Sequence, residues 1–388
     1  MNKNQVTRRQ FIQTSSVGTT ALLVGARQAV SANDKVRLGF IGVGGRGTQL
    51  LKYCTRIPDY EFVAICDKRS ERVERAVNIS KSENQNPKSY TDFEKMLEQE
   101  QLDGVIVATE VGNHAEVVIP VLEAGLNCFS EKPIEANVEK VDQVVKAARK
   151  AKGIFQVGFQ RRYNPTFHKT IETAQSDLLG NITFLQGHWY FSGGVGGWVI
   201  NVDMSGGKLV EQACHHMDVM TWVMNAHPVT CQAMGLVTQP KSSLPDRVTH
   251  YAEDHSSLNF QFPDGTVLTY THFSFMPHQF FTEKLWVMKD EGLIDLPQGL
   301  VYRRKSGQET EPERIAKATD YYEGTYEELA AFADHIRRQE NPLSNVETAR
   351  IATLTALMGH QAMYNRDRKQ YEPSQITWED LGTTTDLS

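Results

Sequence analysis

The chain has 388 residues, of which 40% are hydrophobic, and it carries a formal net charge of −6 at pH 7. This negative balance gives no support for nucleic acid or an anionic membrane surface as a partner. The length suits two domains, each large enough to bury its own core. Five cysteines are scattered without the paired spacing of a zinc site, so we expect them to be reduced and mostly buried: Cys54, Cys66, Cys128, Cys214 and Cys231.

The first segment has the pattern of a twin-arginine export signal. Arg8 and Arg9 precede a weakly polar run without acidic residues over 14–26, and residues 30–32 (Val-Ser-Ala) supply the small side chains of a signal-peptidase site. The run is too short to span a bilayer. We therefore expect residues 1–32 to be removed after export of the folded chain. The segment holds four basic residues and no acidic one, so the mature chain carries a charge of −10.

The next part of the chain alternates apolar strands with helices of roughly 10–15 residues, which predicts a doubly wound parallel sheet over residues 33–158. The expected strands are 36–41, 62–66, 104–108, 126–129 and 155–158. The expected helices are 48–56, 71–80, 93–99, 114–124 and 137–150. Such a sheet is typical of a dinucleotide-binding domain.

Residues 159–388 predict an α+β domain with a largely antiparallel open sheet. Apolar and polar residues alternate over 182–191, 229–237, 255–262, 266–275 and 283–288. Pro263, Asp264 and Gly265 form a hairpin turn between two of these segments. Helices are expected over 207–224, 322–339 and 346–364.

A glycine-rich loop follows the first strand directly and opens the first helix. It reads Gly42-Val-Gly44-Gly-Arg46-Gly47, which fits the G-x-G-x-x-G pattern in its required strand-to-helix context. In this pattern the glycines allow a tight turn, close approach of a pyrophosphate and close packing of helix and strand. The N–H groups at the helix N-terminus then face the phosphates. Gly42, Gly44, Arg46 and Gly47 are therefore predicted to contact a dinucleotide.

Asp67 ends the second predicted strand, 20 residues after Gly47. A carboxylate at this place accepts hydrogen bonds from both hydroxyls of the adenosine ribose. Asp67 favours NAD, because it would repel the 2′-phosphate of NADP. Lys68 and Arg69 could pair with such a phosphate, so NADP stays open as an alternative.

A third cluster, Glu131-Lys132-Pro133, follows the fourth strand, with Thr109 and His114 upstream. Here the chain resembles the Gfo/Idh/MocA oxidoreductases, which include glucose–fructose oxidoreductase and inositol dehydrogenase. The resemblance runs from about residue 36 to the C-terminal helices. It implies that Lys132 lies near the nicotinamide and hydrogen-bonds the reacting hydroxyl, and that Thr109, His114 and Glu131 help to hold the cofactor. Glu110 departs from the family, which commonly has proline there.

A fourth cluster lies on the helix predicted over 207–224. Glu211, His215 and Asp218 stand at i, i+4 and i+7, so we expect them to share one face. An imidazole beside a carboxylate suits proton removal from a hydroxyl. The stretch resembles the family's Asp-x-x-x-His segment, with Glu211 in place of aspartate and His215 as acid/base. The alternative is a helix-terminal acid followed by a buried structural histidine. We expect no metal site, because adjacent His215 and His216 point about 100° apart on a helix.

Two further stretches are candidates for the substrate cleft. The resemblance implies that residues 158–165, with Gln160 near the cofactor, run from the nucleotide domain into that cleft. Arg161 and Tyr163 could bind substrate hydroxyls or carboxylates, or could make interdomain contacts. Trp198 and its neighbouring glycines suit stacking on a sugar, although packing in a core or an oligomer interface is equally compatible. Asp218 completes the predicted substrate contacts, and the resemblance implies a homo-oligomer built by stacking open sheets.

These observations predict an exported NAD(P)-dependent oxidoreductase that acts on a sugar hydroxyl. Because the periplasm has no free nicotinamide pool, we expect the cofactor to be tightly bound and reset in place by a second substrate, as the resemblance to glucose–fructose oxidoreductase implies. Two alternatives remain. One is an NAD-dependent glycosidase that oxidises C3 transiently, eliminates the glycoside, adds water and reduces again; Lys132 speaks against it. The other is a sugar-binding sensor without turnover.

Overall fold

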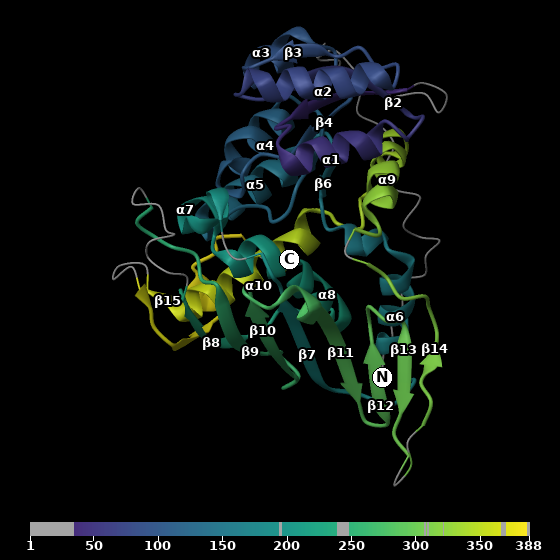
Figure 1. The fold of residues 1–388 in the computed structure, drawn as a ribbon, viewed down its shortest axis with the longest axis vertical. Helices are drawn as coiled ribbons and strands as arrows, with labels where there is room; N and C mark the ends of the chain where they lie inside the picture. Colours follow the sequence, from purple (N-terminus) through teal and green to yellow (C-terminus); the bar gives the residue numbers. More distant parts are fainter. Residues whose placement is uncertain are drawn as a thin grey trace, which may run out of the picture.

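The computed structural model describes residues 35–385, except 194–195, 239–247, 306–307, 309, 321 and 366–369. The predicted export signal therefore lies outside the described residues. The first part of the described chain forms a parallel six-stranded sheet in the order β3-β2-β1-β4-β5-β6 (Figure 1). Its strands are β1 (Val36–Ile41), β2 (Tyr60–Cys66), β3 (Lys88–Tyr90), β4 (Gly104–Val107), β5 (Asn127–Ser130) and β6 (Phe155–Val157). The predicted parallel sheet is confirmed.

Helices cover both faces of this sheet. One face packs on α3 (Phe93–Gln99), α4 (His114–Glu123) and α5 (Val138–Lys150). The other face packs on α1 (Gly45–Cys54), α2 (Ser70–Ser82) and α9 (Thr325–Arg338). Helix α9 comes from the C-terminal part of the chain, and its Phe332 meets Phe129 of β5 with ring centroids 5.9 Å apart. The C-terminal segment therefore completes the helical layer on this face of the parallel sheet.

A nine-stranded sheet forms the second lobe, in the order β14-β13-β12-β11-β7-β10-β9-β8-β17. Its strands are β7 (Ile182–Tyr190), β8 (Thr230–Leu236), β9 (His255–Gln261), β10 (Val267–Phe273), β11 (Thr282–Lys289), β12 (Gly292–Asp295), β13 (Leu300–Arg303), β14 (Glu313–Arg314) and β17 (Ser374–Thr377). All neighbouring pairs are antiparallel except β7 and β10, which run parallel. The predicted hairpin between β9 and β10 is confirmed, and Gly265 has φ +90°.

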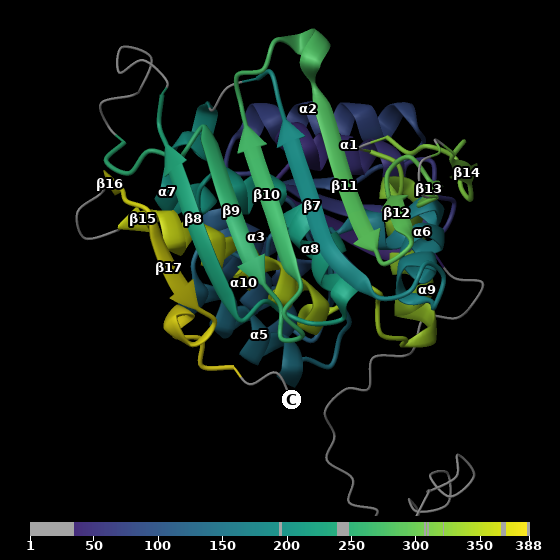
Figure 2. The same ribbon diagram turned by 90° about the horizontal axis from the view of Figure 1, so that it is seen from below.

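One face of this large sheet is covered by helices. They are α6 (Pro165–Gln175), α8 (Cys214–Met224) and α10 (Val346–Met363). Figure 2 looks onto the opposite face, on which no described element packs. The remaining short elements are η1 (Val111–Asn113), η2 (Gln160–Tyr163), η3 (Gly197–Ile200), α7 (Val202–Ser205), η6 (His278–Phe280), β15 (Tyr364–Asn365), β16 (Gln370–Tyr371) and η7 (Glu379–Leu381).

The helix predicted over 207–224 is present over 208–224, but it is not an α-helix throughout. Gly206 and Gly207 have φ of +75° and +100°, which ends α7. The chain then forms a π-helix, η4 (Leu209–Ala213), and only afterwards the α-helix α8. A π-turn holds one more residue than an α-turn, so it rotates every later side chain relative to the earlier ones.

The described part of the chain contains no helix long and apolar enough to cross a membrane. All five cysteines are buried and none is in a disulfide, as the sequence predicts. Burial raises the pKa of the Cys128 and Cys231 thiols well above the usual range, so these groups stay protonated and serve as apolar filling.

Candidate active site

A cavity of about 550 Å³ lies between the two lobes, at the carboxyl ends of the parallel strands. Open parallel sheets bind their ligands at this edge. Eight of the predicted site residues line it: Arg46, Thr109, His114, Glu131, Lys132, Trp198, Glu211 and His215. The other described lining residues are Gly45, Thr48, Gln49, Lys52, Ala108, Val111 and Tyr322. Two of the three catalytic candidates come from the second lobe, so the cavity needs both lobes.

The glycine loop is shaped for close backbone approach. A Cβ added to Gly47 would lie 2.0 Å from the carbonyl oxygen of Gly42, so only glycine fits there. No side chain caps the N-terminus of α1, and its first residues, Gly45 and Arg46, face the cavity. An uncapped helix N-terminus with open space in front of it suits a pyrophosphate.

Two further groups fit a dinucleotide. Asp67 is buried at the end of β2, where its carboxylate accepts hydrogen bonds from the backbone N–H groups of Val43 (2.9 Å) and Arg69 (3.0 Å). Each carboxylate oxygen keeps further acceptor capacity for a ribose hydroxyl. At the cavity wall, the buried hydroxyl oxygen of Thr109 has no hydrogen-bond partner among the described residues. A bound dinucleotide would supply one.

Arg46 links the glycine loop to the Glu-Lys-Pro segment. Its Nε donates to Glu131 Oε1 at 2.7 Å, and its Nη2 lies 3.8 Å from Oε1 of Glu328 on α9. Burial, reinforced by Glu131, raises the pKa of Glu328 well above its ordinary value, which favours the neutral form of this acid. Sequence reasoning missed Glu328, because it lies far along the chain from Arg46 and Glu131 and no local pattern marks it.

His114 connects two loops at the carboxyl ends of the parallel strands. Its ring nitrogens lie 2.9 Å from the carbonyl oxygen of Pro133 and 3.3 Å from that of Thr109. The imidazole is fully buried, and this burial lowers its pKa. It therefore ties the loop after β4 to the loop after β5, where the Lys132–Pro133 peptide bond is cis.

Lys132 and Glu211 meet across the cavity. The Lys132 ammonium donates to the backbone carbonyl of Glu211 at 2.6 Å and lies 3.7 Å from its carboxylate. Lys208 Nζ approaches the same carboxylate at 3.3 Å. Burial raises the pKa of Glu211, but the two ammonium groups outweigh it and hold the pKa below its ordinary value. Glu211 is therefore ionised and acts as the counter-charge for Lys132.

His215 lies beside this pair, 1% exposed, with its ring edge-on to Phe159. Burial lowers the pKa of His215 well below 6.5, and the positive charges of Lys132, Arg161 and Arg46 lower it further. The imidazole is therefore neutral at neutral pH and can accept a proton.

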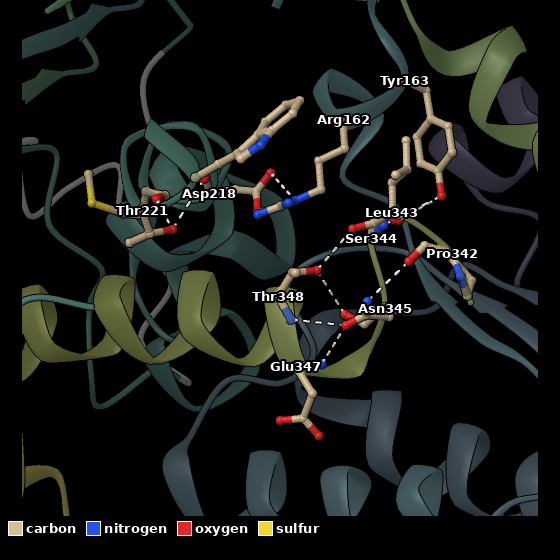
Figure 3. A network of polar contacts seen from close by, with 12 residues as sticks. Arg162, Tyr163, Asp218, Thr221, Pro342, Leu343, Ser344, Asn345, Glu347 and Thr348 are labelled. Carbon is tan, nitrogen blue, oxygen red and sulfur yellow. Dashed lines mark hydrogen bonds and ion pairs between the residues drawn. The ribbon is translucent and has the colours of Figure 1, made fainter. Parts of the chain in front are cut away.

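The structure places Asp218 away from the cavity lining. The predicted shared face holds for Glu211 and His215, whereas Asp218 is fully buried and is not among the described residues that line the cavity. Figure 3 shows its carboxylate facing Arg162, whose Nε and Nη2 each lie 2.8 Å from Oδ1. His215 and Asp218 both lie in α8, so Asp218 keeps helical spacing from His215 but meets Arg162 of η2 instead of the cavity.

Arg161, Tyr163 and Gln160 are also buried outside the cavity lining. The Tyr163 hydroxyl accepts weak hydrogen bonds from Ser344 (Figure 3), and burial raises its pKa to about 12. Arg161 pairs with Glu283 at 2.5 Å. These contacts tie Arg161 to β11 of the large sheet and Tyr163 to the segment before α10.

His216 likewise has a structural place. Its Nε2 lies 2.9 Å from Glu283 and its Nδ1 lies 2.7 Å from the Tyr270 hydroxyl. It points into the sheet of the second lobe while His215 points to the cavity, which separates the two adjacent histidines as expected.

Comparison with known families covers most of the chain. Residues 36–159 match the family described as "Oxidoreductase family, NAD-binding Rossmann fold" of the GFO_IDH_MocA group. Residues 167–295 match the "GFO/IDH/MocA C-terminal domain". The first match contains the glycine loop, Asp67 and Lys132, and the second contains Glu211 and His215.

Among curated relatives, the chain is 31% identical over 145 residues to a myo-inositol 2-dehydrogenase of Thermotoga maritima, an alignment that spans 37% of this chain and 42% of that protein. It is 25% identical over 349 residues to an inositol 2-dehydrogenase/D-chiro-inositol 3-dehydrogenase of Lacticaseibacillus casei, covering 87% of this chain and 93% of that one. It is also 36% identical over 126 residues to a glycosyl hydrolase family 109 protein of Stenotrophomonas maltophilia, covering 31% and 28%.

Solved structures share the fold. The structure of a myo-inositol dehydrogenase from Lactobacillus casei, in complex with NAD(H) and myo-inositol, superposes with a TM-score of 0.68 at 21% identity. The superposition covers 88% of this chain and 97% of that one. Both lobes are therefore arranged as in that protein.

Proposed function

The chain belongs to the Gfo/Idh/MocA family of oxidoreductases and binds NAD through its Rossmann fold, and from this premise we propose that it is a dehydrogenase acting on a hydroxyl of a sugar or related polyol. One observation carries the proposal. A neutral, buried histidine and a lysine paired with Glu211 both line the cavity beside the glycine loop. This is the set of groups that alcohol oxidation requires.

Each residue has a chemical task in this proposal. His215 takes the proton from the substrate hydroxyl, because its lowered pKa keeps the imidazole neutral. Lys132 donates a hydrogen bond to the same oxygen and stabilises the negative charge that develops on it. Glu211 holds the Lys132 ammonium in place through their ion pair. When bound, NAD accepts the hydride from the carbon that carries this hydroxyl.

The substrate class follows from the relatives and the cavity wall. Three curated relatives carry the names of an inositol dehydrogenase or a glycoside hydrolase, and both names point to ring-shaped polyols. Trp198 and Tyr322 line the cavity and are 37% and 49% exposed, so their rings are available for stacking on the C–H face of such a ring.

The proposal is tested on the purified mature protein. Denaturation should release a nicotinamide dinucleotide, which identifies the cofactor as NAD or NADP and gives its redox state. The native protein is then incubated with myo-inositol, free sugars and aryl glycosides while the absorbance of the nicotinamide is followed. Reduction by a free polyol supports the dehydrogenase. Failure of every polyol to change the redox state contradicts it.

The second candidate function is an NAD-dependent glycoside hydrolase. The match to a family 109 protein favours it, although the aligned part covers only 28% of that protein. Such an enzyme would release the aglycone of an aryl glycoside without net reduction of NAD. Lys132, paired with Glu211, is the feature that favours the dehydrogenase.

We further propose that the protein is exported, that it holds its cofactor tightly and that it forms a homo-oligomer. The twin-arginine pattern supports export to the periplasm, and export of a folded chain supports a tightly bound cofactor that a second substrate restores in place. The face of the nine-stranded sheet on which no described element packs suits the stacking of two chains in a homo-oligomer (Figure 2).

A further inference from the structure

A buried carboxylate outside the cavity anchors the helix that carries Glu211. We propose that Glu253 is a positioning residue, which fixes the start of η4 and through it the contact between Glu211 and Lys132. The inference rests on the proposed function for the meaning of that contact. Glu253 lies just before β9 and is fully buried.

Three groups hold the Glu253 carboxylate from different elements. Its Oε1 accepts a hydrogen bond of 2.6 Å from the backbone N–H of Leu209, the first residue of η4. Its Oε2 accepts one of 3.1 Å from the Tyr371 hydroxyl and lies 3.5 Å from Nδ1 of His360 on α10. Burial raises the pKa of Glu253, but the contact with His360 and the bond from Leu209 outweigh it, so the group is ionised.

The double glycine before η4 is explained by this carboxylate. Gly207 has φ +100°, and a Cβ there would lie 2.5 Å from His360 Nδ1 and 2.8 Å from Glu253 Oε2. Only glycine lets the chain pass directly over the His360–Glu253 pair. The chain then turns so that the N–H of Leu209 meets the carboxylate.

The anchor matters because π-turns are rare and occur mostly as single turns inside α-helices, frequently at functional sites. Without the bond to Leu209, the start of η4 is free to tighten towards α-helical geometry. The backbone carbonyl and the carboxylate of Glu211 would then shift relative to Lys132, which bonds both. The cofactor loop lies in the other lobe and does not depend on Glu253, so the cofactor should bind normally while the reacting groups are misplaced.

The test compares three variants of the full holoenzyme. Glu253→Ala removes the acceptor, and Glu253→Gln keeps an amide oxygen that can accept from Leu209. Tyr371→Phe is the matched control, because it removes a hydrogen bond from the same carboxylate and leaves the bond from Leu209. We measure kcat, KM, NAD affinity and amide hydrogen exchange over residues 209–213.

We expect Glu253→Ala to lower kcat by about 10²-fold, the usual effect of a misplacement of about 1 Å, with NAD affinity unchanged. Glu253→Gln should restore most of kcat, and Tyr371→Phe should keep it. Amide exchange over 209–213 should rise in the alanine variant alone. If Glu253→Ala does not fold, Glu253→Asp takes its place, because aspartate keeps the charge but is too short to reach Leu209. It should likewise lower kcat, leave NAD affinity unchanged and raise amide exchange over 209–213.

The proposal is overturned if the alanine variant keeps its kcat, or if kcat and NAD affinity fall together and glutamine restores neither. The exchange measurement distinguishes failure of the Glu253 anchor from failure of the proposed function. If the amides over 209–213 exchange faster in Glu253→Ala but the wild type oxidises no polyol, the anchor is supported and the proposed function is rejected. Unchanged protection in an active enzyme would reject the anchor alone.

Discussion

The sequence pattern and the structure give Asp218 different surroundings. The sequence places it among the substrate contacts, whereas the structure buries it against Arg162 with three donor–acceptor distances of 2.8, 2.8 and 3.1 Å. Arg162 also lies over the ring of Trp222 at 5.0 Å. We therefore predict that Asp218→Asn destabilises the protein and leaves the chemistry intact.

The expected loss of unfolding free energy in Asp218→Asn follows from the burial of the Arg162–Asp218 ion pair. The side chains are 8% and 0% exposed, so the asparagine amide would turn a donor towards a buried guanidinium. Breaking a buried pair from one side costs about 3–5 kcal/mol, a large share of the roughly 5–15 kcal/mol by which domains are stable. Burial raises the pKa of Asp218 although Arg162 lowers it, as expected for an ion pair that is costly to bury. The double variant Arg162→Met/Asp218→Leu should therefore recover much of the loss.

The assay is equilibrium unfolding in urea, measured on the holoenzyme, together with kcat at a temperature at which each variant is folded. We expect a lower free energy of unfolding in Asp218→Asn, partial recovery in the double variant, and unchanged kcat in both. The reasoning is refuted if Asp218→Asn unfolds like the wild type and loses turnover, because Asp218 would then contact the substrate.

Three further outcomes are expected. His215→Ala should lower kcat by about 10²–10⁴-fold, the worth of a positioned general base, and should bind NAD normally in a titration; an undiminished kcat would exclude His215 as the base. Because burial and Lys132 lower the pKa of His215, turnover should stay level near neutral pH and fall only as the pH drops well below 6.5; a loss already above 6.5 would contradict this. Asp67→Ala should weaken NAD binding by roughly 1–3 kcal/mol, as calorimetry can show; equal affinity would remove Asp67 from the cofactor site.

The sequence predicts the parallel sheet well because its strands are continuous apolar runs. The exception is β3, whose residues Lys88, Ser89 and Tyr90 are exposed or half-exposed and carry no apolar run. The short strands β12, β13 and β17 were missed for a related reason. Each has only four residues, too few for alternation to stand out.

The candidate site was predictable where a motif fixes the local geometry. The glycine loop and Lys132 both follow parallel strands, so their place at the cavity edge follows from topology. The contacts of Glu328 and Tyr322 were not predictable, because they arise when α9 folds back onto the first lobe. The contact of Asp218 with Arg162 was not predictable, because helical spacing gives the face of a residue and not the partner that another element brings to it.

The central claim is that His215 removes a proton from a polyol hydroxyl while the bound nicotinamide is reduced. A single-turnover experiment tests it directly: the NAD-loaded protein is mixed with myo-inositol and with free sugars, and the absorbance of reduced nicotinamide is followed in the wild type and in His215→Ala. The account predicts reduced nicotinamide in an amount equal to the protein for at least one polyol, formed far more slowly in the variant. Release of an aglycone from aryl glycosides without any reduced nicotinamide from free polyols, or equal rates in both proteins, would contradict it.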